Sequence, residues 1–216
     1  MTSRVFPRVV LSTSRLLLRP FQAEDARDVH AVWNDEAYLR FAPAGLASAG
    51  ADLDAAGRWC SQTAEEARIA GKSVSIAGSG RDGGRILCHV ALFGTDWSAM
   101  IAEIHYWTAP WARGHGYAAE AARAVSRWAL VEQGFVRITL KTVTGNTASR
   151  RVAESAGFRY EGTLRNAAWT RTGRGDFAIY SLICGDLEEL EATQDGIPTG
   201  KCLSSVESSP GLERRR

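Results

Sequence analysis

The chain of 216 residues lacks the features of secreted, membrane-spanning and nucleic-acid-binding proteins. No stretch reaches the roughly 18 apolar residues that a membrane span needs, and Met1 to Arg15 contains no uninterrupted apolar core of signal-peptide length. The 26 basic and 24 acidic residues give a net charge of +2, which offers no general attraction to nucleic acid or to a membrane surface. We therefore expect a cytoplasmic protein that binds neither.

Cysteine is also scarce. Cys60, Cys88, Cys184 and Cys202 are far apart and form no C-x-x-C pair. This spacing suggests neither a zinc site nor a disulfide framework. We expect reduced thiols and no bound metal.

Apolar residues are plentiful, since 45% of the chain is hydrophobic and seven residues are Trp. That is enough to build the core of one domain, which we assign to residues 9–186. Residues 187–216 are first acidic, then rich in Ser, Gly and Pro, and end in three arginines. This composition predicts a disordered tail.

Hydrophobic periodicity and breaker residues predict strands that alternate with helices. The expected strands are 16–20, 73–77, 86–93, 102–107, 136–143, 158–162 and 177–183, with a glycine turn at 78–84 between the second and the third. The expected helices are 23–33, 51–70, 118–133 and 147–156, with a loop at 43–50. This order indicates an α/β protein with a mixed sheet.

The most informative segment is Arg113-Gly114-His115-Gly116-Tyr117-Ala118, between an expected strand and an expected helix. Its glycines allow a tight turn and a close approach of the backbone to a ligand. The first N–H groups of the helix have no intrahelical partner, and they lie at the positive end of the helix dipole. The segment therefore predicts a site for a diphosphate.

Two familiar glycine motifs fit poorly. A dinucleotide-binding fold has its glycines after the first strand and an acidic residue on a second strand, whereas Glu132 ends the same helix here. A P-loop needs Gly-Lys-Ser/Thr, which the segment lacks. A nucleotide-dependent oxidoreductase is thus a weaker alternative.

The segment resembles the acetyl-CoA motif of the GCN5-related N-acetyltransferase (GNAT) superfamily. Further motifs are similar to the branch named for the ribosomal-protein acetyltransferases RimJ and RimL, in the order 13–20, 106–110, 114–121, 146–154 and 156–165. The likeness continues to Tyr180-Ser181 and so covers most of the expected domain.

This resemblance implies a GNAT fold, an α/β (α+β) arrangement. Its mostly antiparallel central sheet would have about six to seven strands, with a splayed parallel pair, and about four flanking helices. It implies acetyl-CoA as cosubstrate, with its pantetheine along the strand at 102–107 and its thiol end beside the start of the helix at 147–156. The implied cofactor-binding residues are Trp107, Thr108, Ala109, Arg113, Gly114, His115, Gly116, Tyr117, Ala118, Asn146 and Ser149.

The implied reaction is direct attack of a primary amine on the acetyl thioester. Ser149, or a tyrosine, would protonate the leaving thiolate, and a base must take a proton from the amine. Family members place a glutamate at the positions of Lys141 or Ala168, so this chain departs from both patterns. Glu103 is the best remaining carboxylate, and His105 shares its strand face.

Each of these residues also has a purely structural interpretation. Glu103 fits an exposed strand residue and His105 a packing histidine. Arg113 fits a loop cap, His115 a solvent-facing residue, and Asn146 the N-cap of its helix with Ser149 exposed in the first turn. The choice between these interpretations depends on the tertiary structure.

The acceptor is a protein or peptide N-terminal amine or a small-molecule amine, in a monomer or a homodimer. Its binding walls are expected at 32–59 and 164–175. Asp25, Asp28, Asp35 and Glu36, in and just after the first expected helix, are candidates to attract a cation or to form a solvated face. The departures at Lys141 and Ala168 leave open a catalytically silent acyl-CoA-binding regulatory module.

Overall fold

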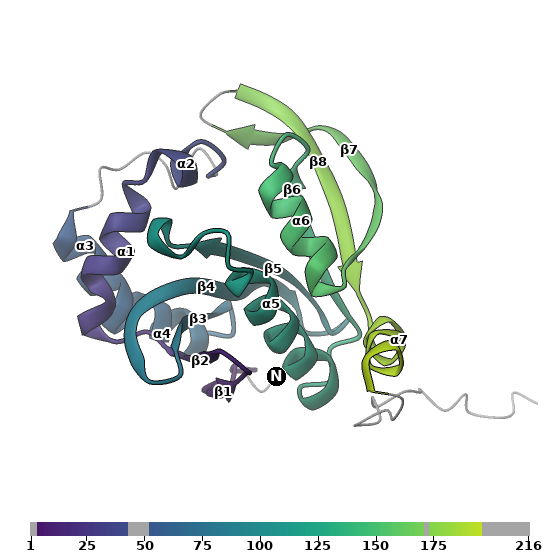
Figure 1. Cartoon of the computed structure of the whole chain (residues 1–216), viewed down its shortest axis with the longest axis horizontal. Helices are drawn as coiled ribbons and strands as arrows, with labels where there is room; N and C mark the ends of the chain where they lie inside the picture. Colours follow the sequence, from purple (N-terminus) through teal and green to yellow (C-terminus); the bar gives the residue numbers. More distant parts are fainter. Residues whose placement is uncertain (1–3, 43–51, 171–172, 196–216) are drawn as a thin grey trace, which may run out of the picture.

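The computed structural model describes residues 4–42, 52–170 and 173–195. They form one eight-stranded sheet with the order β1-β2-β3-β4-β5-β6-β8-β7 (Figure 1). Its strands are β1 (Leu11–Ser12), β2 (Leu16–Pro20), β3 (Ser73–Gly80), β4 (Gly83–Asp96), β5 (Ile101–Thr108), β6 (Arg137–Val143), β7 (Arg159–Thr170) and β8 (Gly173–Leu182). The short β1 brings the sheet to one strand more than expected.

The pairing between β5 and β6 is parallel, whereas each of the other described pairings is antiparallel. A parallel pair needs a crossover connection, and helix α5 (Tyr117–Arg127) supplies it. The expected mixed, mostly antiparallel sheet with one parallel pair is confirmed.

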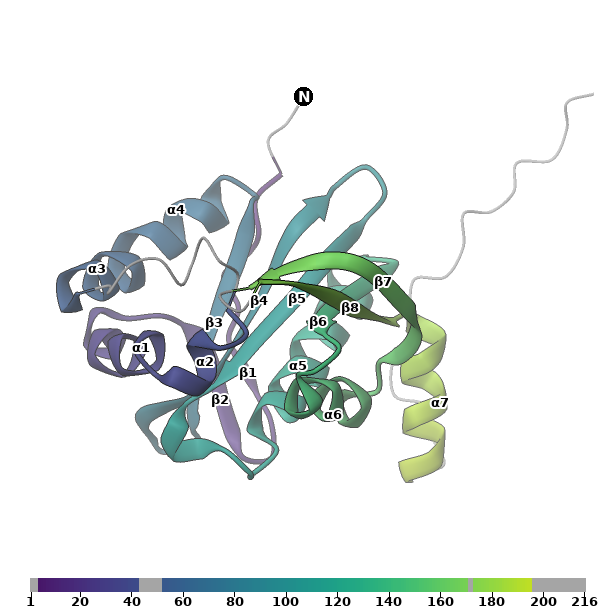
Figure 2. The same ribbon diagram turned by 90° about the horizontal axis from the view of Figure 1, so that it is seen from above.

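Helices cover both faces of the sheet. Helix α5 and helix α6 (Thr147–Ala156) lie on one face, and α1 (Ala26–Trp33), α3 (Leu53–Arg58) and α4 (Ala64–Ile69) lie on the other (Figure 2). The expected helix at 23–33 is present as a 3-10 turn at Ala23–Asp25 that continues into α1, and a separate short helix, α2 (Glu36–Leu39), follows. The expected helix at 51–70 contains a π-helical turn at Trp59–Thr63, which joins α3 to α4.

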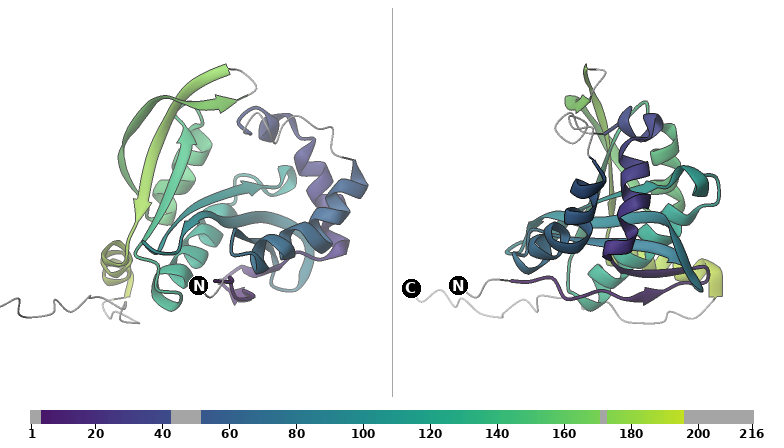
Figure 3. Two further views of the ribbon diagram at one scale, coloured as in Figure 1. Left: turned by 180° about the vertical axis from the view of Figure 1, so that it is seen from behind. Right: turned by 90° about the vertical axis from the view of Figure 1, so that its left-hand side faces the viewer.

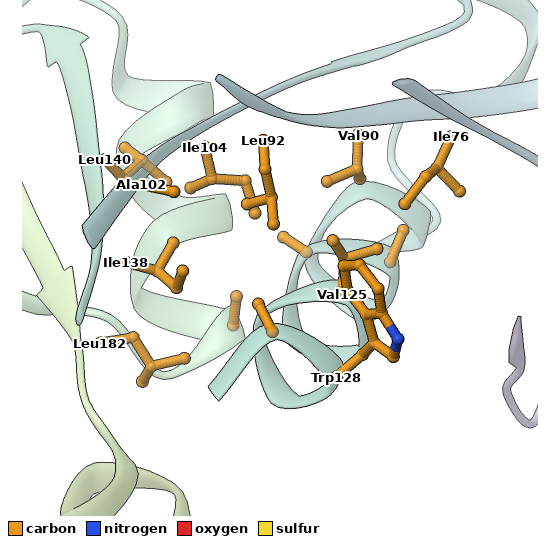
Figure 4. Packing of buried hydrophobic residues seen from close by; sticks show 14 of the residues in the cluster. Ile76, Val90, Leu92, Ala102, Ile104, Val125, Trp128, Ile138, Leu140 and Leu182 are labelled. Atoms are coloured by element: carbon orange, nitrogen blue, oxygen red, sulfur yellow. The ribbon is translucent and has the colours of Figure 1, made fainter. Parts of the chain in front are cut away.

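The main core lies between the sheet and helix α5. Strand side chains at alternate positions, among them Val90, Leu92 and Ile104, point toward Val125 of α5 and toward Trp128, which directly follows that helix (Figure 4). This two-residue alternation assigns the residues between them to the opposite face. His89 and His105 therefore belong to the face that α1 and α3 partly cover.

The expected turn at 78–84 is wrong in extent, because β3 runs to Gly80 and β4 begins at Gly83. Gly78 is needed within the strand: a Cβ there would lie 2.6 Å from Cys88 Sγ. The turn is confined to residues 81–82, with irregular pairing on its β3 side. Glycine here permits close packing rather than a loop.

Helix α7 (Cys184–Asp195) continues past residue 186, the expected end of the domain, and the side chain of Leu187 is buried in the main core. The rest of the expected tail, and the expected loop at 43–50, lie outside the described residues. Cys60 and Cys88 are buried free thiols. No helix within the described ranges is both long and apolar enough to cross a membrane.

Candidate active site

Strands β5 and β6 separate halfway along their length. Their pairing runs from Ile101 opposite Arg137 to Ile104 opposite Leu140, although β5 continues to Thr108 and β6 to Val143. Each strand keeps its other neighbour to the end, because β5 pairs with β4 and β6 with β8. The edge of β5 from His105 to Thr108 can therefore pair with an added extended chain.

The glycine segment follows β5 and leads into helix α5. Gly114 and Gly116 have φ angles of +82° and +77°, a conformation that glycine adopts without strain. A Cβ at Gly114 would meet nothing within 4 Å, and one at Gly116 would meet only Arg15 Nη2, at 3.7 Å. Gly116 is the N-cap of α5 and provides no side chain to cap its first N–H groups. The turn therefore presents open space in front of uncapped donors, as an anion site requires.

Contacts with the N-terminal segment fix this turn in place. Arg15 forms an ion pair with Glu120 of α5 at 2.6 Å and donates from Nη1 to the His115 carbonyl oxygen at 2.8 Å. The hydroxyl of Thr13 also donates to Glu120, at 2.5 Å. Desolvation alone would raise the pKa of Glu120, but these hydrogen bonds outweigh it and lower the pKa. His115 contacts its own loop, with Nδ1 2.8 Å from the Arg113 carbonyl oxygen.

Arg113 is engaged by a carboxylate. Its guanidinium pairs with Asp35, which lies at the turn between α1 and α2 and also accepts the Tyr38 N–H at 2.9 Å as the N-cap of α2. The hydrogen bond from Arg113 lowers the pKa of Asp35. The sequence had suggested Asp35 as a candidate to attract a cation, whereas the fold uses it to join helix α2 to the glycine turn.

On the α6 face, Tyr106 and Ser149 meet beside the opening. The Tyr106 hydroxyl donates to the Ser149 carbonyl oxygen at 2.8 Å and lies 3.1 Å from Ser149 Oγ. Burial raises the pKa of Tyr106, so the phenol stays protonated. Asn146 Oδ1 accepts the Ser149 N–H at 3.1 Å and thus caps α6. Ser149 and Asn146 are predicted from the sequence, whereas Tyr106 is found there only as part of a motif. The alternation of side chains along β5, which places Tyr106 on the face opposite His105, was the sequence feature that could have identified it.

On the opposite face, Glu103 and His105 lie side by side as expected. Glu103 forms an ion pair with Lys141 of β6, so the lysine that replaces the expected glutamate neutralises the nearest carboxylate. The ring of His105 is exposed, and its centroid lies 5.1 Å from that of His89 and 5.2 Å from that of Phe93. Desolvation by the surrounding protein atoms lowers the pKa of His105 to about 4, which leaves the imidazole neutral at pH 7. The other departure, Ala168, is buried on β7 opposite Gly175.

Figure 3 shows the surroundings of this face, with the β7–β8 hairpin on one side of β5 and the α1–α2 segment on the other. The hairpin carries an irregular stretch between Leu164 and Ala168. There the Asn166 N–H donates to Asp176 Oδ1 at 2.7 Å, and the Asp176 carbonyl oxygen accepts the Thr144 N–H at 2.9 Å. These contacts join the hairpin to the loop that precedes Asn146.

Comparison with known proteins gives consistent matches. The family model described as "Acetyltransferase (GNAT) domain" matches residues 15–159. The Bacillus subtilis (strain 168) protein YdaF, whose name assigns it provisionally to the ribosomal N-acetyltransferases, is 32% identical over 94 residues, which are 44% of this chain and 51% of YdaF. The chain thus spans about half the length of this curated relative.

Two solved structures share the fold. RimJ of Mycobacterium smegmatis, in complex with CoA-disulfide, has a TM-score of 0.71 at 20% identity, covering 80% of this chain and 83% of RimJ. RimL, the ribosomal L7/L12 α-N-protein acetyltransferase, in complex with coenzyme A, has a TM-score of 0.71 at 17% identity, covering 81% of this chain and 97% of RimL.

Proposed function

The chain belongs to the acetyltransferase (GNAT) domain family, and on that premise we propose that it transfers the acetyl group of acetyl-CoA to a primary amine. One observation carries the proposal. Beyond Ile104, β5 and β6 separate, and the next two residues of β5, His105 and Tyr106, face opposite sides of the sheet at that opening.

Acetyl-CoA fits the residues around the opening. The uncapped N–H groups at the start of α5 and the open space before Gly114 suit its diphosphate. The β5 edge at Trp107, Thr108 and Ala109 suits its pantetheine. When bound, acetyl-CoA supplies an activated thioester beside Ser149 and Tyr106.

The two proton transfers of the reaction take place on opposite faces of the sheet. The amine approaches from the face of His105, whose neutral imidazole accepts a proton directly or through water. The thiolate takes its proton on the other face, from the Ser149–Tyr106 pair. Glu103 holds Lys141 beside the opening, a position from which the ammonium group stabilises negative charge on the thioester oxygen.

The available bases are weak, which favours acceptors of low basicity. His105 has a pKa of about 4, and Glu103 is paired with an ammonium group. An α-amine, with a pKa of about 7.7 to 8.0, is partly neutral at pH 7, whereas a lysine amine, at about 10.4, is almost wholly charged. We therefore propose N-terminal or other α-amines as acceptors, in line with the RimL match.

A screen of peptides, amino acids and small amines with acetyl-CoA tests this function. Thiol release and one added acetyl group by mass spectrometry are the expected results. Acetyl-CoA binding without transfer to any acceptor would instead support the silent regulatory module.

A further inference from the structure

A continuous band of rings lies on the face of the sheet where the acceptor amine would approach. We define the ring band as Phe21, Trp33, Trp59, His89, Phe93, His105 and Trp107. Neighbouring rings have centroids 4.8 to 5.8 Å apart, most of them in edge or tilted contact. The band begins at α1, passes through the π-helical turn, and ends on β4 and β5.

At the centre of the band, His89 is 2% exposed, and neither ring nitrogen has a hydrogen-bond partner in the described structure. Phe21, Trp59, His105 and Trp107 surround its imidazole. A buried polar group without a partner costs stability that an apolar ring of similar shape would not. Packing alone therefore does not account for a histidine at this position.

Other parts of the ring band reach the surface. His105 is exposed, Phe93 is 36% exposed, and Trp33 and Trp59 are half-buried. Phe93 and His105 form a ring pair at 5.2 Å directly beside the opening between β5 and β6. A ligand ring placed here would extend an existing chain of aromatic contacts.

Four carboxylates named above as candidates are paired. Asp25 pairs with Arg19, Asp28 with Arg85, Asp35 with Arg113 and Glu103 with Lys141. None of these four carboxylates is left to attract a cationic acceptor. Contact with neutral rings also desolvates an ammonium group and so lowers its pKa, which suits a site whose bases are weak.

We propose that the acceptor carries an aromatic ring within a few bonds of its primary amine, and that the exposed part of the ring band receives this ring. The inference rests on the proposed acetyl transfer. Two sources share this chemistry: a free arylalkylamine and a peptide with an aromatic N-terminal residue. In both, the ring lies against Phe93, the exposed ring that pairs with His105, while the amine points toward the opening beside His105.

Calorimetry on the full chain saturated with CoA tests recognition separately from turnover. The matched ligands are 2-phenylethylamine and 2-cyclohexylethylamine, and a peptide beginning with phenylalanine compared with the same peptide beginning with cyclohexylalanine. We expect the aromatic member of at least one pair to bind roughly three- to tenfold more tightly, which is the preference of one aromatic pair. The ligand pair that shows the aromatic preference tells whether the acceptor is a free arylalkylamine or a peptide N-terminus.

Phe93→Leu should remove most of this preference. Tyr160→Leu is the matched control, because Tyr160 is a 54% exposed ring on β7 that packs against Tyr180 on the α6 face. Circular dichroism excludes loss of folding. Equal affinity within both pairs, or an aromatic preference that survives Phe93→Leu, would overturn the inference. Transfer to aliphatic and aromatic amines at equal kcat/KM would overturn it while leaving the proposed function standing, and transfer to no amine at all would overturn both.

Discussion

The hydroxyl of Tyr106 lies 3.1 Å from Ser149 Oγ, although the two residues are 43 positions apart in the chain. The contact joins the middle of β5 to the first turn of α6, beside the point where β5 and β6 separate. Burial raises the pKa of Tyr106, so this pair can donate a proton but does not ionise near pH 7.

If this pair protonates the leaving thiolate, Ser149→Ala and Tyr106→Phe should each lower kcat by about 10²-fold, the usual contribution of a positioned acid. CoA affinity should change little, because neither variant touches the glycine turn. The double variant should cost less than the product of the two, since both act through one contact. Steady-state thiol release measures the rates; unchanged kcat in both single variants would contradict the role.

Gly116→Trp should weaken acetyl-CoA binding by at least tenfold. The φ angle of +77° strains any L-residue there, and the indole would fill the open space before α5. Gly83→Trp is the matched control, because Gly83 has a φ of +86° with nothing near its Cβ position but is the first residue of β4, next to the β3–β4 turn. Calorimetry measures the affinities. Equal affinity of the Gly116 variant and the wild type for acetyl-CoA would show that this turn does not bind the diphosphate.

The pH dependence of kcat/KM should follow the pKa of the acceptor amine rather than the pKa of an ordinary histidine. His105, with a pKa of about 4, is neutral throughout the working range. The acidic limb should therefore shift with the pKa of the amine, from near 8 for an α-amine to near 10.4 for a lysine-like amine. His105→Gln should lower kcat by roughly tenfold or more without moving this limb. A fixed inflection near pH 6.5 for all acceptors would contradict this assignment.

Acid should destabilise the fold through the two histidines on this face. Burial lowers the pKa of both His89 and His105 below 6.5, so the unfolded chain binds more protons than the native one as the pH falls below that value. The free energy of unfolding should then decrease from pH 6.5 toward pH 4. His89→Phe should flatten this decrease and stabilise the protein by about 1 kcal/mol at pH 7, because it removes the unpartnered ring nitrogens. Denaturant titrations at several pH values provide the measurement, and an unchanged slope would contradict the expectation.

Removing the carboxylate next to the glycine turn should affect cofactor affinity. Asp35→Asn keeps a side chain that can cap α2 but frees Arg113 from its ion pair. The loss of one negative charge beside a diphosphate site should tighten CoA binding about threefold at low salt, with a smaller effect at high salt. Weaker binding would show instead that the ion pair is needed to shape the turn.

Features that depend on neighbouring residues were predictable from the sequence. The strand before the glycine segment, the helix after it, and helix α6, whose bounds 147–156 are as predicted, follow from local periodicity and from glycines at helix ends. The glycine turn proposed to hold the diphosphate was predictable for the same reason, since its glycines and donors lie within a few residues. Family motifs added the position of Ser149 beside the opening.

Only the tertiary structure decided which distant side chains meet. It joined Glu103 to Lys141, Arg113 to Asp35 and Tyr106 to Ser149, and it surrounded His89 with rings from three separate segments. The extent of the β3–β4 turn was also decided there, by the close packing of Gly78 against Cys88. Strand register and helix packing set these distances, and both depend on the whole core rather than on any local stretch. The sequence thus determined where a cofactor could bind, and the fold determined what would stand opposite it to receive the acceptor.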